Sequence, residues 1–170
     1  FGITSSVGAE TPVLKSSKGT NQQLRQTRKA LKLTQKKAKK LKVKARVALR
    51  LNPTVQVKTH RYISTGNKTH KFGILKEDLI NIISNKSLWQ SSTLVGLSIH
   101  IGSQLTCLKA TKQAIKEMSR IALDLKHPLQ FLDVGGGLGV NYNPQKDLIP
   151  SVPTYMKTVS EALQSSFFNK

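Results

Sequence analysis

Acidic residues are scarce in this chain of 170 residues, in which 8 Asp and Glu accompany 28 Lys and Arg. The formal net charge is +20, and no acidic residue occurs between Glu10 and Glu77. Biosynthetic enzymes usually mix both signs of charge on their surface. The imbalance therefore predicts nonspecific attraction to nucleic acid at low salt, while it does not define a fold.

Cysteine and long apolar runs are also nearly missing. Cys107 is the only cysteine, which excludes an intrachain disulfide and is typical of a reducing compartment such as the cytoplasm. The spacing between His60 and His70 matches no standard metal-binding motif, and no cysteine lies beside them. We therefore predict no metal site. No apolar stretch reaches membrane-spanning length and no hydrophobic signal segment is found. These absences favour a cytoplasmic chain without a membrane partner.

The stretch Phe131–Gly139 is the most informative part of the sequence, because a short apolar run ends abruptly in four glycines within five residues. An apolar run rich in Leu and Val is typical of a buried strand. Glycine adopts positive φ values easily and leaves its backbone N–H groups uncovered. Consecutive free N–H groups form a concavity suited to phosphate. The turn therefore indicates a phosphate site, although a tight turn without a ligand can have the same composition.

Apolar spacing in the rest of the chain predicts alternating strands and helices. We expect strands at Ala45–Leu51, Leu94–Ile101 and Gln130–Val134, and helices at Leu75–Ser84 and Ala110–Lys126. This order favours parallel strands joined by right-handed crossovers. The carboxyl ends of parallel strands meet at one rim, where α/β barrels bind their ligands. We therefore expect Arg50, His100, Ser103 and the glycine turn to lie together.

Five sequence blocks stand out together, namely Ala45–Pro53, Tyr62–Gly66, Lys71–Ile74, His100–Gln104 and Leu132–Gly139. These blocks resemble the diaminopimelate decarboxylases, which share the pyridoxal-phosphate barrel with ornithine and arginine decarboxylases and alanine racemase. They occur in the family's order, and the second and third point to the diaminopimelate branch rather than the ornithine branch. The resemblance implies an α/β fold, namely a partial (β/α)8 TIM barrel of the pyridoxal-phosphate-binding type. Roughly three βα units with parallel strands are expected.

The resemblance implies a role for each matching residue. In the family, the histidine of the His-Ile-Gly-Ser block stacks on the cofactor's pyridine ring, which gives this role to His100. Ser103 is expected to donate its hydroxyl to the phosphate, and Arg50 to lie near the ring oxygen. The backbone N–H groups of three glycines are expected to hold the phosphate of pyridoxal 5'-phosphate. These glycines are Gly135, Gly136 and Gly137.

Two catalytic motifs of the family have no counterpart here. Neither the Tyr-Ala-Val-Lys-Ala-Asn type motif with the Schiff-base lysine nor the Glu-Pro-Gly-Arg type motif occurs, so we assign no catalytic residue. The carboxy-terminal β domain, which completes the family's site across a dimer interface, is not matched either. A homodimer is expected only for the full-length family member. Since the sequence begins at Phe1, we expect a middle piece of a longer protein or a degraded copy, inactive by itself.

The function implied by the resemblance is removal of carbon dioxide from meso-diaminopimelate to give L-lysine, a step of lysine biosynthesis. The partner is then a small amino-acid substrate. Three alternatives remain open at this point. They are another decarboxylase or racemase on the same barrel, a barrel remnant without catalysis, and a basic nucleic-acid-binding protein.

The lysine-rich segment Asn21–Val43 has its own two interpretations. Leu31 and Ala38 are part of a narrow apolar stripe at helical spacing, which predicts a helix with a solvated, lysine-covered face. The alternative is a nucleic-acid patch, but no aromatic side chain alternates with the lysines to stack on bases. We expect residues 1–20 to form a poorly ordered leader and residues 21–170 to form the partial barrel domain.

Overall fold

The computed structural model describes residues 18–55, 72–142 and 149–165. Its helices are α1 (Lys18–Lys40), α2 (Lys76–Ser84), the 3-10 helix η1 (Lys86–Trp89), α3 (Lys109–Asp124) and α4 (Val152–Leu163). Its strands are β1 (Ala45–Leu51), β2 (Ser92–Ile99) and β3 (Phe131–Asp133). The block Tyr62–Gly66, both His60 and His70, and residues 1–17 of the predicted leader lie outside the described residues. α1 includes residues 18–20, and the division at residue 20 stays a prediction.

The described strands form one sheet in the order β1-β2-β3, and both pairs are parallel. The prediction of parallel strands in an α/β fold is therefore confirmed. In the register, Arg50 pairs with Ser98 and Ser98 pairs with Asp133. These three residues form a row across the carboxyl end of the sheet, because parallel strands end on the same side.

The predicted strand bounds are right for β1 and shifted for its neighbours. β2 begins at Ser92 rather than Leu94, since Ser92 is buried, pairs with Ala45 and donates its hydroxyl to the carbonyl of Leu88 at 3.3 Å. β2 also ends at Ile99, so His100 belongs to the loop that follows. β3 is only three residues long, shorter at both ends than the predicted Gln130–Val134.

The two faces of the sheet have opposite character. One face contributes Leu49, Leu51, Leu97 and Ile99 to a single apolar core, together with residues from all four α-helices. On the other face, Arg46, Ala48 and Arg50 of β1 and Phe131 and Asp133 of β3 are exposed. The period-2 alternation of a strand explains this division, because successive side chains point to opposite faces. The face that the helices leave uncovered therefore displays three charged side chains together with Ala48 and Phe131.

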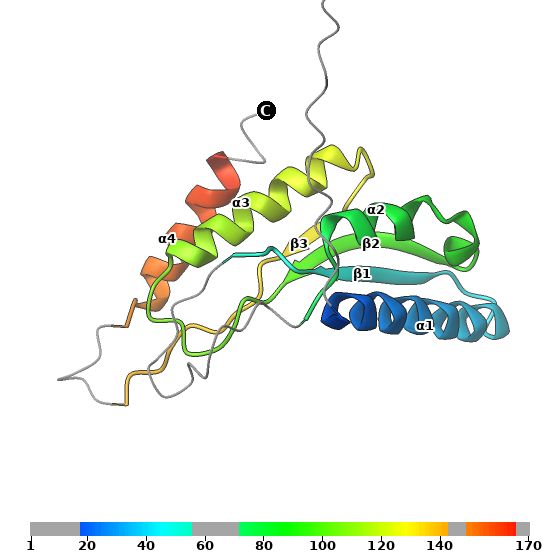
Figure 1. Ribbon diagram of the computed structural model, residues 1–170. Helices are drawn as coiled ribbons and strands as arrows, with labels where there is room; N and C mark the ends of the chain where they lie inside the picture. The colour runs from blue at the N-terminus through cyan, green and yellow to red at the C-terminus, as the bar shows by residue number, and fades with distance from the viewer. Residues whose placement is uncertain (1–17, 56–71, 143–148, 166–170) are drawn as a thin grey trace, which may run out of the picture.

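The helices pack on the core face through apolar residues at helical spacing. α3 buries Ala114, Ile115 and Met118 completely, and α1 buries Leu31 and Ala38. α1 runs alongside β1, while α3 and α4 pack against each other as a pair (Figure 1). Sequence reasoning missed α4, although the capping signal is present. The Ser151 hydroxyl accepts the Thr154 N–H at 3.3 Å, and a proline occupies the first turn.

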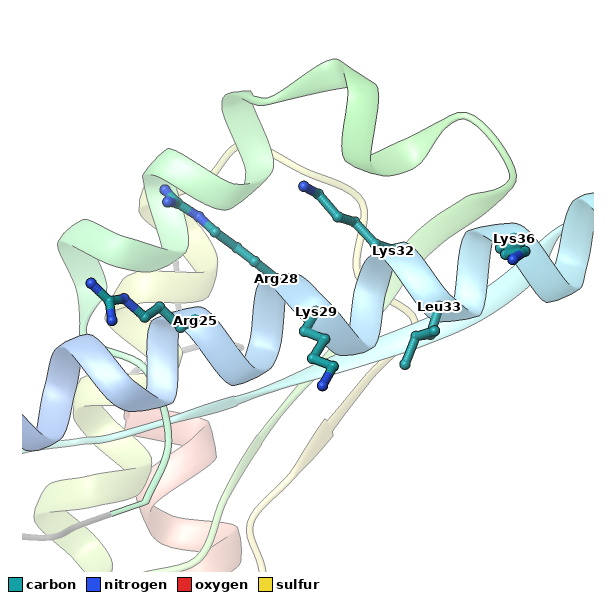
Figure 2. Close-up of a pocket in the computed structure, with 6 residues that line it drawn as sticks. All are labelled: Arg25, Arg28, Lys29, Lys32, Leu33 and Lys36. Atoms are coloured by element: carbon teal, nitrogen blue, oxygen red, sulfur yellow. The ribbon is translucent and has the colours of Figure 1, made fainter.

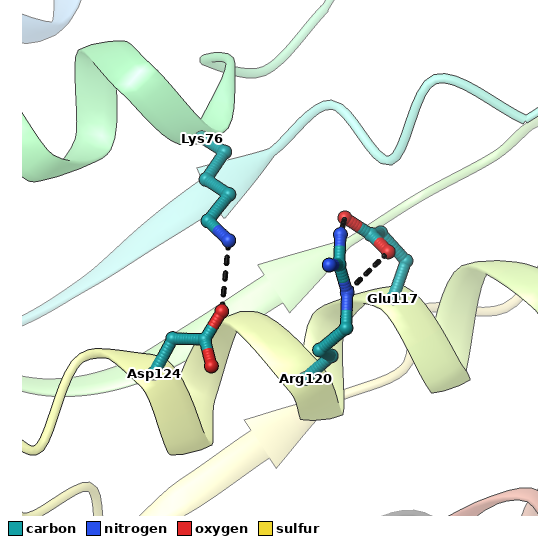
Figure 3. Close-up of polar contacts among 4 residues, drawn as sticks. All are labelled: Lys76, Glu117, Arg120 and Asp124. Atoms are coloured by element: carbon teal, nitrogen blue, oxygen red, sulfur yellow. Dashed lines mark hydrogen bonds and ion pairs between the residues drawn. The ribbon is translucent and has the colours of Figure 1, made fainter. Parts of the chain in front are cut away.

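The ion pairs between the described helices are exposed to solvent. Lys76 Nζ of α2 lies 2.8 Å from Asp124 Oδ2 at the end of α3, and Arg120 binds Glu117 within α3 (Figure 3). The side chains of Lys76 and Asp124 are 30% and 51% exposed. Water screens such pairs, so their contribution to stability is small.

Replacing Lys76 by methionine is expected to lower the free energy of unfolding by less than about 1 kcal/mol, because the aliphatic stem is retained and only a screened ion pair is lost. The loss should shrink further in concentrated salt. Urea denaturation measures it, with Lys116→Met on the exposed surface of α3 as the matched control. A loss above about 2 kcal/mol relative to this control would contradict the expectation.

Candidate functional site

The candidate site lies where the three parallel strands end. Arg50 is the penultimate residue of β1, His100 directly follows β2, and the glycine turn, residues 135–137, begins two residues after β3. The Arg50 guanidinium donates a hydrogen bond from Nη2 to the carbonyl of His100 at 3.1 Å. It also lies 5.5 Å from the ring centroid of Phe72, within the range of a cation–π contact. The structure thus brings the predicted rim residues of β1 and β2 together.

The loop after β2 pairs directly with the glycine turn. The Leu105 N–H donates to the carbonyl of Gly137 at 2.8 Å, and the Gly139 N–H donates to the carbonyl of Leu105 at 3.1 Å. The Gln104 side chain accepts the Val140 N–H at 2.7 Å. These backbone bonds fix the His100–Gln104 loop beside the turn, as the sequence predicted.

Only glycine fits at the first and third positions of the turn. Gly135 has φ +72° and Gly137 has φ +99°. A Cβ added at Gly137 would overlap the carbonyl oxygen of Gly102 and lie 3.4 Å from the Cα of Ser103. A Cβ added at Gly135 would overlap the carbonyl oxygen of Ile99. The two loops therefore approach each other backbone to backbone.

Gly136, between them, faces open space. A Cβ added there would meet no heavy atom within 4 Å. Within the described part of the chain, the N–H groups of Gly136 and Gly137 have no hydrogen-bond acceptor, whereas the Gly135 N–H donates to Asp133 Oδ1 at 2.9 Å. Two adjacent free donors beside an unfilled space are the arrangement expected of an anion-binding turn. His100 and Ser103 are exposed on the adjoining loop.

Two residues at this turn were missed by sequence reasoning. Asp133 ends β3, and its carboxylate accepts the Gly135 N–H. Tyr155 of α4 is buried, and its hydroxyl donates to the carbonyl of Gly135 at 3.0 Å. Burial raises the pKa of Tyr155 and the charge of Asp133 raises it further, so the hydroxyl keeps its proton at neutral pH. The Asp-x-Gly spacing could have indicated the first contact, but no local signal marks the second.

The described residues contain no group of three or more His, Cys, Asp or Glu side chains placed to hold a metal ion. None of the described helices is long and apolar enough to cross a membrane. Cys107 is exposed and is a free cysteine.

Comparison with known proteins identifies a family and individual proteins to which this chain is similar. Residues 20–170 match the family model for the pyridoxal binding domain of pyridoxal-dependent decarboxylases. Diaminopimelate decarboxylase of Helicobacter pylori is 36% identical over 141 residues, which cover 79% of this chain and 33% of that protein. The enzyme of the same name from Zymomonas mobilis is 39% identical over 115 residues, which cover 66% of this chain and 27% of that protein.

The fold comparison agrees with the sequence comparison. The crystal structure of diaminopimelate decarboxylase from H. pylori complexed with L-lysine matches with a TM-score of 0.69 and 33% identity. The match covers 82% of this chain and 36% of that structure. The chain spans about a third of the length of the curated relatives it matches.

Proposed function

The chain belongs to the pyridoxal-dependent decarboxylases through their pyridoxal binding domain, and from this premise we propose that it serves the decarboxylation of meso-diaminopimelate to L-lysine. The relatives that support this substrate bear the name diaminopimelate decarboxylase at 36% and 39% identity. We further propose that its three parallel strands are part of a (β/α)8 barrel, and that the reaction is a step of lysine biosynthesis. A cytoplasmic location, and a homodimer for the full-length family member, stay predictions.

The observation that carries the proposal is the open space beside Gly136. It adjoins two N–H groups without acceptors among the described residues, and it lies at the carboxyl rim of a parallel sheet. A phosphate group needs such donors and room for its oxygens. The residues present therefore fit the phosphate end of pyridoxal 5'-phosphate.

We assign the binding roles as follows. Gly136 and Gly137 offer backbone N–H groups to the phosphate, Gly135 shapes the turn, and Ser103 adds its hydroxyl from the neighbouring loop. His100 provides a flat ring for the cofactor's pyridine ring, and Arg50 provides a positive charge at the same rim. When bound, pyridoxal phosphate supplies an electron sink for the electrons left at the substrate's α-carbon when carbon dioxide departs.

The remaining contribution of these residues is positioning. Arg50 is held on one side by the Phe72 ring and donates on the other to the His100 carbonyl. These two contacts of Arg50 fix the point at which the loop leaves β2. They thereby fix the start of the segment that carries His100 and Ser103. A site held by backbone bonds and a charged side chain loses less entropy when the ligand binds.

The proposed activity is tested on the complete gene product. Carbon dioxide release should occur with meso-diaminopimelate and be at least about tenfold slower with L-ornithine or L-arginine, since a site built for one substrate's polar groups rejects others. Preference for ornithine or arginine would overturn the substrate assignment. Racemisation without carbon dioxide release would identify a racemase, and no reaction at all would support a non-catalytic remnant.

A second candidate function rests on α1. The helix contains nine basic and no acidic residues. A shallow hollow on it is lined by Arg25, Arg28, Lys29, Lys32, Leu33 and Lys36. Arg28 and Lys32 extend toward α2, and Lys29 and Leu33 extend to the opposite side (Figure 2). In the described ranges these side chains form no salt bridge, although Arg28 interacts electrostatically with Asp78 of α2. The other positive charges are therefore available to a polyanion. We propose that this surface binds nucleic acid without sequence preference.

Binding of duplex DNA is expected to weaken steeply as salt rises, because each phosphate contact releases a counterion. The triple variant Lys29→Gln, Lys32→Gln, Lys36→Gln should reduce the slope of log K against log salt by roughly 2 to 3. Fluorescence anisotropy at several salt concentrations measures this slope. The matched control changes three exposed lysines elsewhere, Lys86, Lys109 and Lys116. Equal effects of the two triples would show that net charge alone is responsible.

A further inference from the structure

The peptide groups around Gly135 are held by two side chains from different elements. Asp133 Oδ1, at the end of β3, accepts the Gly135 N–H at 2.9 Å. The Tyr155 hydroxyl, from α4, donates to the Gly135 carbonyl at 3.0 Å. Both polar backbone groups of this one residue are therefore engaged by side chains.

The Tyr155 contact also determines where the next N–H group points. The Gly135 carbonyl and the Gly136 N–H belong to the same peptide plane, and in a trans peptide they point in opposite directions. The peptide bonds described here include no cis bond. With the carbonyl held by α4, the Gly136 N–H is directed away from Tyr155. That N–H has no acceptor among the described residues.

A run of three glycines does not by itself favour any one direction for its N–H groups. Glycine occupies left-handed and right-handed regions about equally, so an unrestrained turn would spread its N–H groups over many directions. Here Gly135 and Gly137 are fixed at positive φ, and the intervening peptide is held through its carbonyl. Pre-organised donors bind a ligand more tightly because less freedom is lost.

We propose that Tyr155 and Asp133 are positioning residues that orient the Gly136 N–H for an anion such as a phosphate group. This inference rests on the proposed function, since the anion is the phosphate that the turn is there assigned to hold. Neither side chain needs to touch the phosphate. Tyr155 acts through the Gly135 carbonyl, and Asp133 acts through the Gly135 N–H.

The charge of Asp133 provides an independent argument. A carboxylate near a phosphate site repels the ligand, so its presence calls for a compensating role. One of its oxygens is occupied by the Gly135 N–H. An asparagine retains an acceptor oxygen at this position without the charge, whereas an alanine loses both. The two substitutions therefore separate hydrogen bonding from electrostatics.

The test follows the amide signals of Gly136 and Gly137 by NMR while inorganic phosphate is added to the 170-residue chain. Tyr155→Phe should raise the dissociation constant for phosphate roughly 3- to 10-fold, as expected for one lost hydrogen bond. The unfolding midpoint should change little, because the buried ring is retained. Tyr142→Phe is the matched control, since Tyr142 is 80% exposed. It should leave the constant unchanged.

The Asp133 variants complete the test. Asp133→Asn should bind phosphate at least as tightly as the wild type, and Asp133→Ala should bind it more weakly. A purely electrostatic role predicts tighter binding for both and would overturn the assignment of Asp133. If phosphate shifts the Gly136 and Gly137 signals in the wild type and Tyr155→Phe binds phosphate with the same dissociation constant, only the positioning role of Tyr155 is overturned. Absence of any shift at Gly136 and Gly137 in the wild type overturns both this inference and the proposed phosphate site.

Discussion

Replacing Gly136 by alanine is expected to weaken phosphate binding strongly without loss of stability, whereas the same replacement at Gly137 should destabilise the fold. At Gly136 the added methyl group enters the open space assigned to the phosphate, and φ lies outside the left-handed region. Since the backbone accepts alanine, the free energy of unfolding should rise by about 0.4–1 kcal/mol. The affinity for phosphate should fall at least about tenfold, because ligand and methyl group cannot share the space.

The neighbouring position has the opposite balance. At Gly137 the methyl group overlaps the Gly102 carbonyl, and φ is +99°. Backbone strain and overpacking together should lower the free energy of unfolding by on the order of 2–5 kcal/mol. Urea denaturation and phosphate titration of both variants measure the two effects separately. If Gly136→Ala bound phosphate like the wild type, the turn would not be the phosphate site.

The 170-residue chain alone is expected to release no carbon dioxide from meso-diaminopimelate in the presence of pyridoxal phosphate. The family's motif for the lysine that bonds the cofactor's aldehyde has no counterpart in this sequence. The sheet face that carries Arg50 and Asp133 is exposed, so the described residues do not exclude water from the rim. Catalysis depends on attachment and orientation of the cofactor as well as on phosphate binding.

Borohydride reduction followed by peptide mapping provides the measurement. The chain has 22 lysines, and none of them lies in the family's Schiff-base motif. Label is therefore expected to scatter at low stoichiometry over the exposed lysines. A diaminopimelate decarboxylase from H. pylori serves as the positive control for carbon dioxide release. One lysine labelled stoichiometrically in this chain, together with carbon dioxide release, would show that the chain is an active enzyme by itself.

The sequence was sufficient for the parts of the fold that depend on local pattern. Apolar runs and helical spacing located β1, α2 and α3 closely, because burial dictates those patterns. It also predicted that Arg50, His100 and the glycine turn meet at one rim, which follows from parallel pairing alone. The start of β2 was harder to predict from the sequence, because it depends on the hydrogen bond of Ser92 to Leu88 and on the pairing of Ser92 with Ala45.

The contacts that shape the candidate site were not predictable in this way. Tyr155 reaches Gly135 from a helix twenty residues further along the chain, and nothing in the local pattern of α4 specifies that partner. Likewise, Asp133 occupies the Gly135 N–H, so that of the three glycines in the turn Gly136 and Gly137 keep N–H groups without an acceptor among the described residues. Which glycine does which task is a tertiary property. The assigned cofactor roles of His100, Ser103 and Arg50 stay predictions.

The order of the strands has a consequence for how the chain folds during synthesis. Each strand pairs with the strand that immediately precedes it, so β1 and β2 can associate before β3 leaves the ribosome. The glycine turn emerges next, but Tyr155 emerges only with α4. Translation therefore completes the scaffold first and the oriented turn last. A nascent chain that stops before α4 has a sheet and three glycines but lacks the hydroxyl that aligns them.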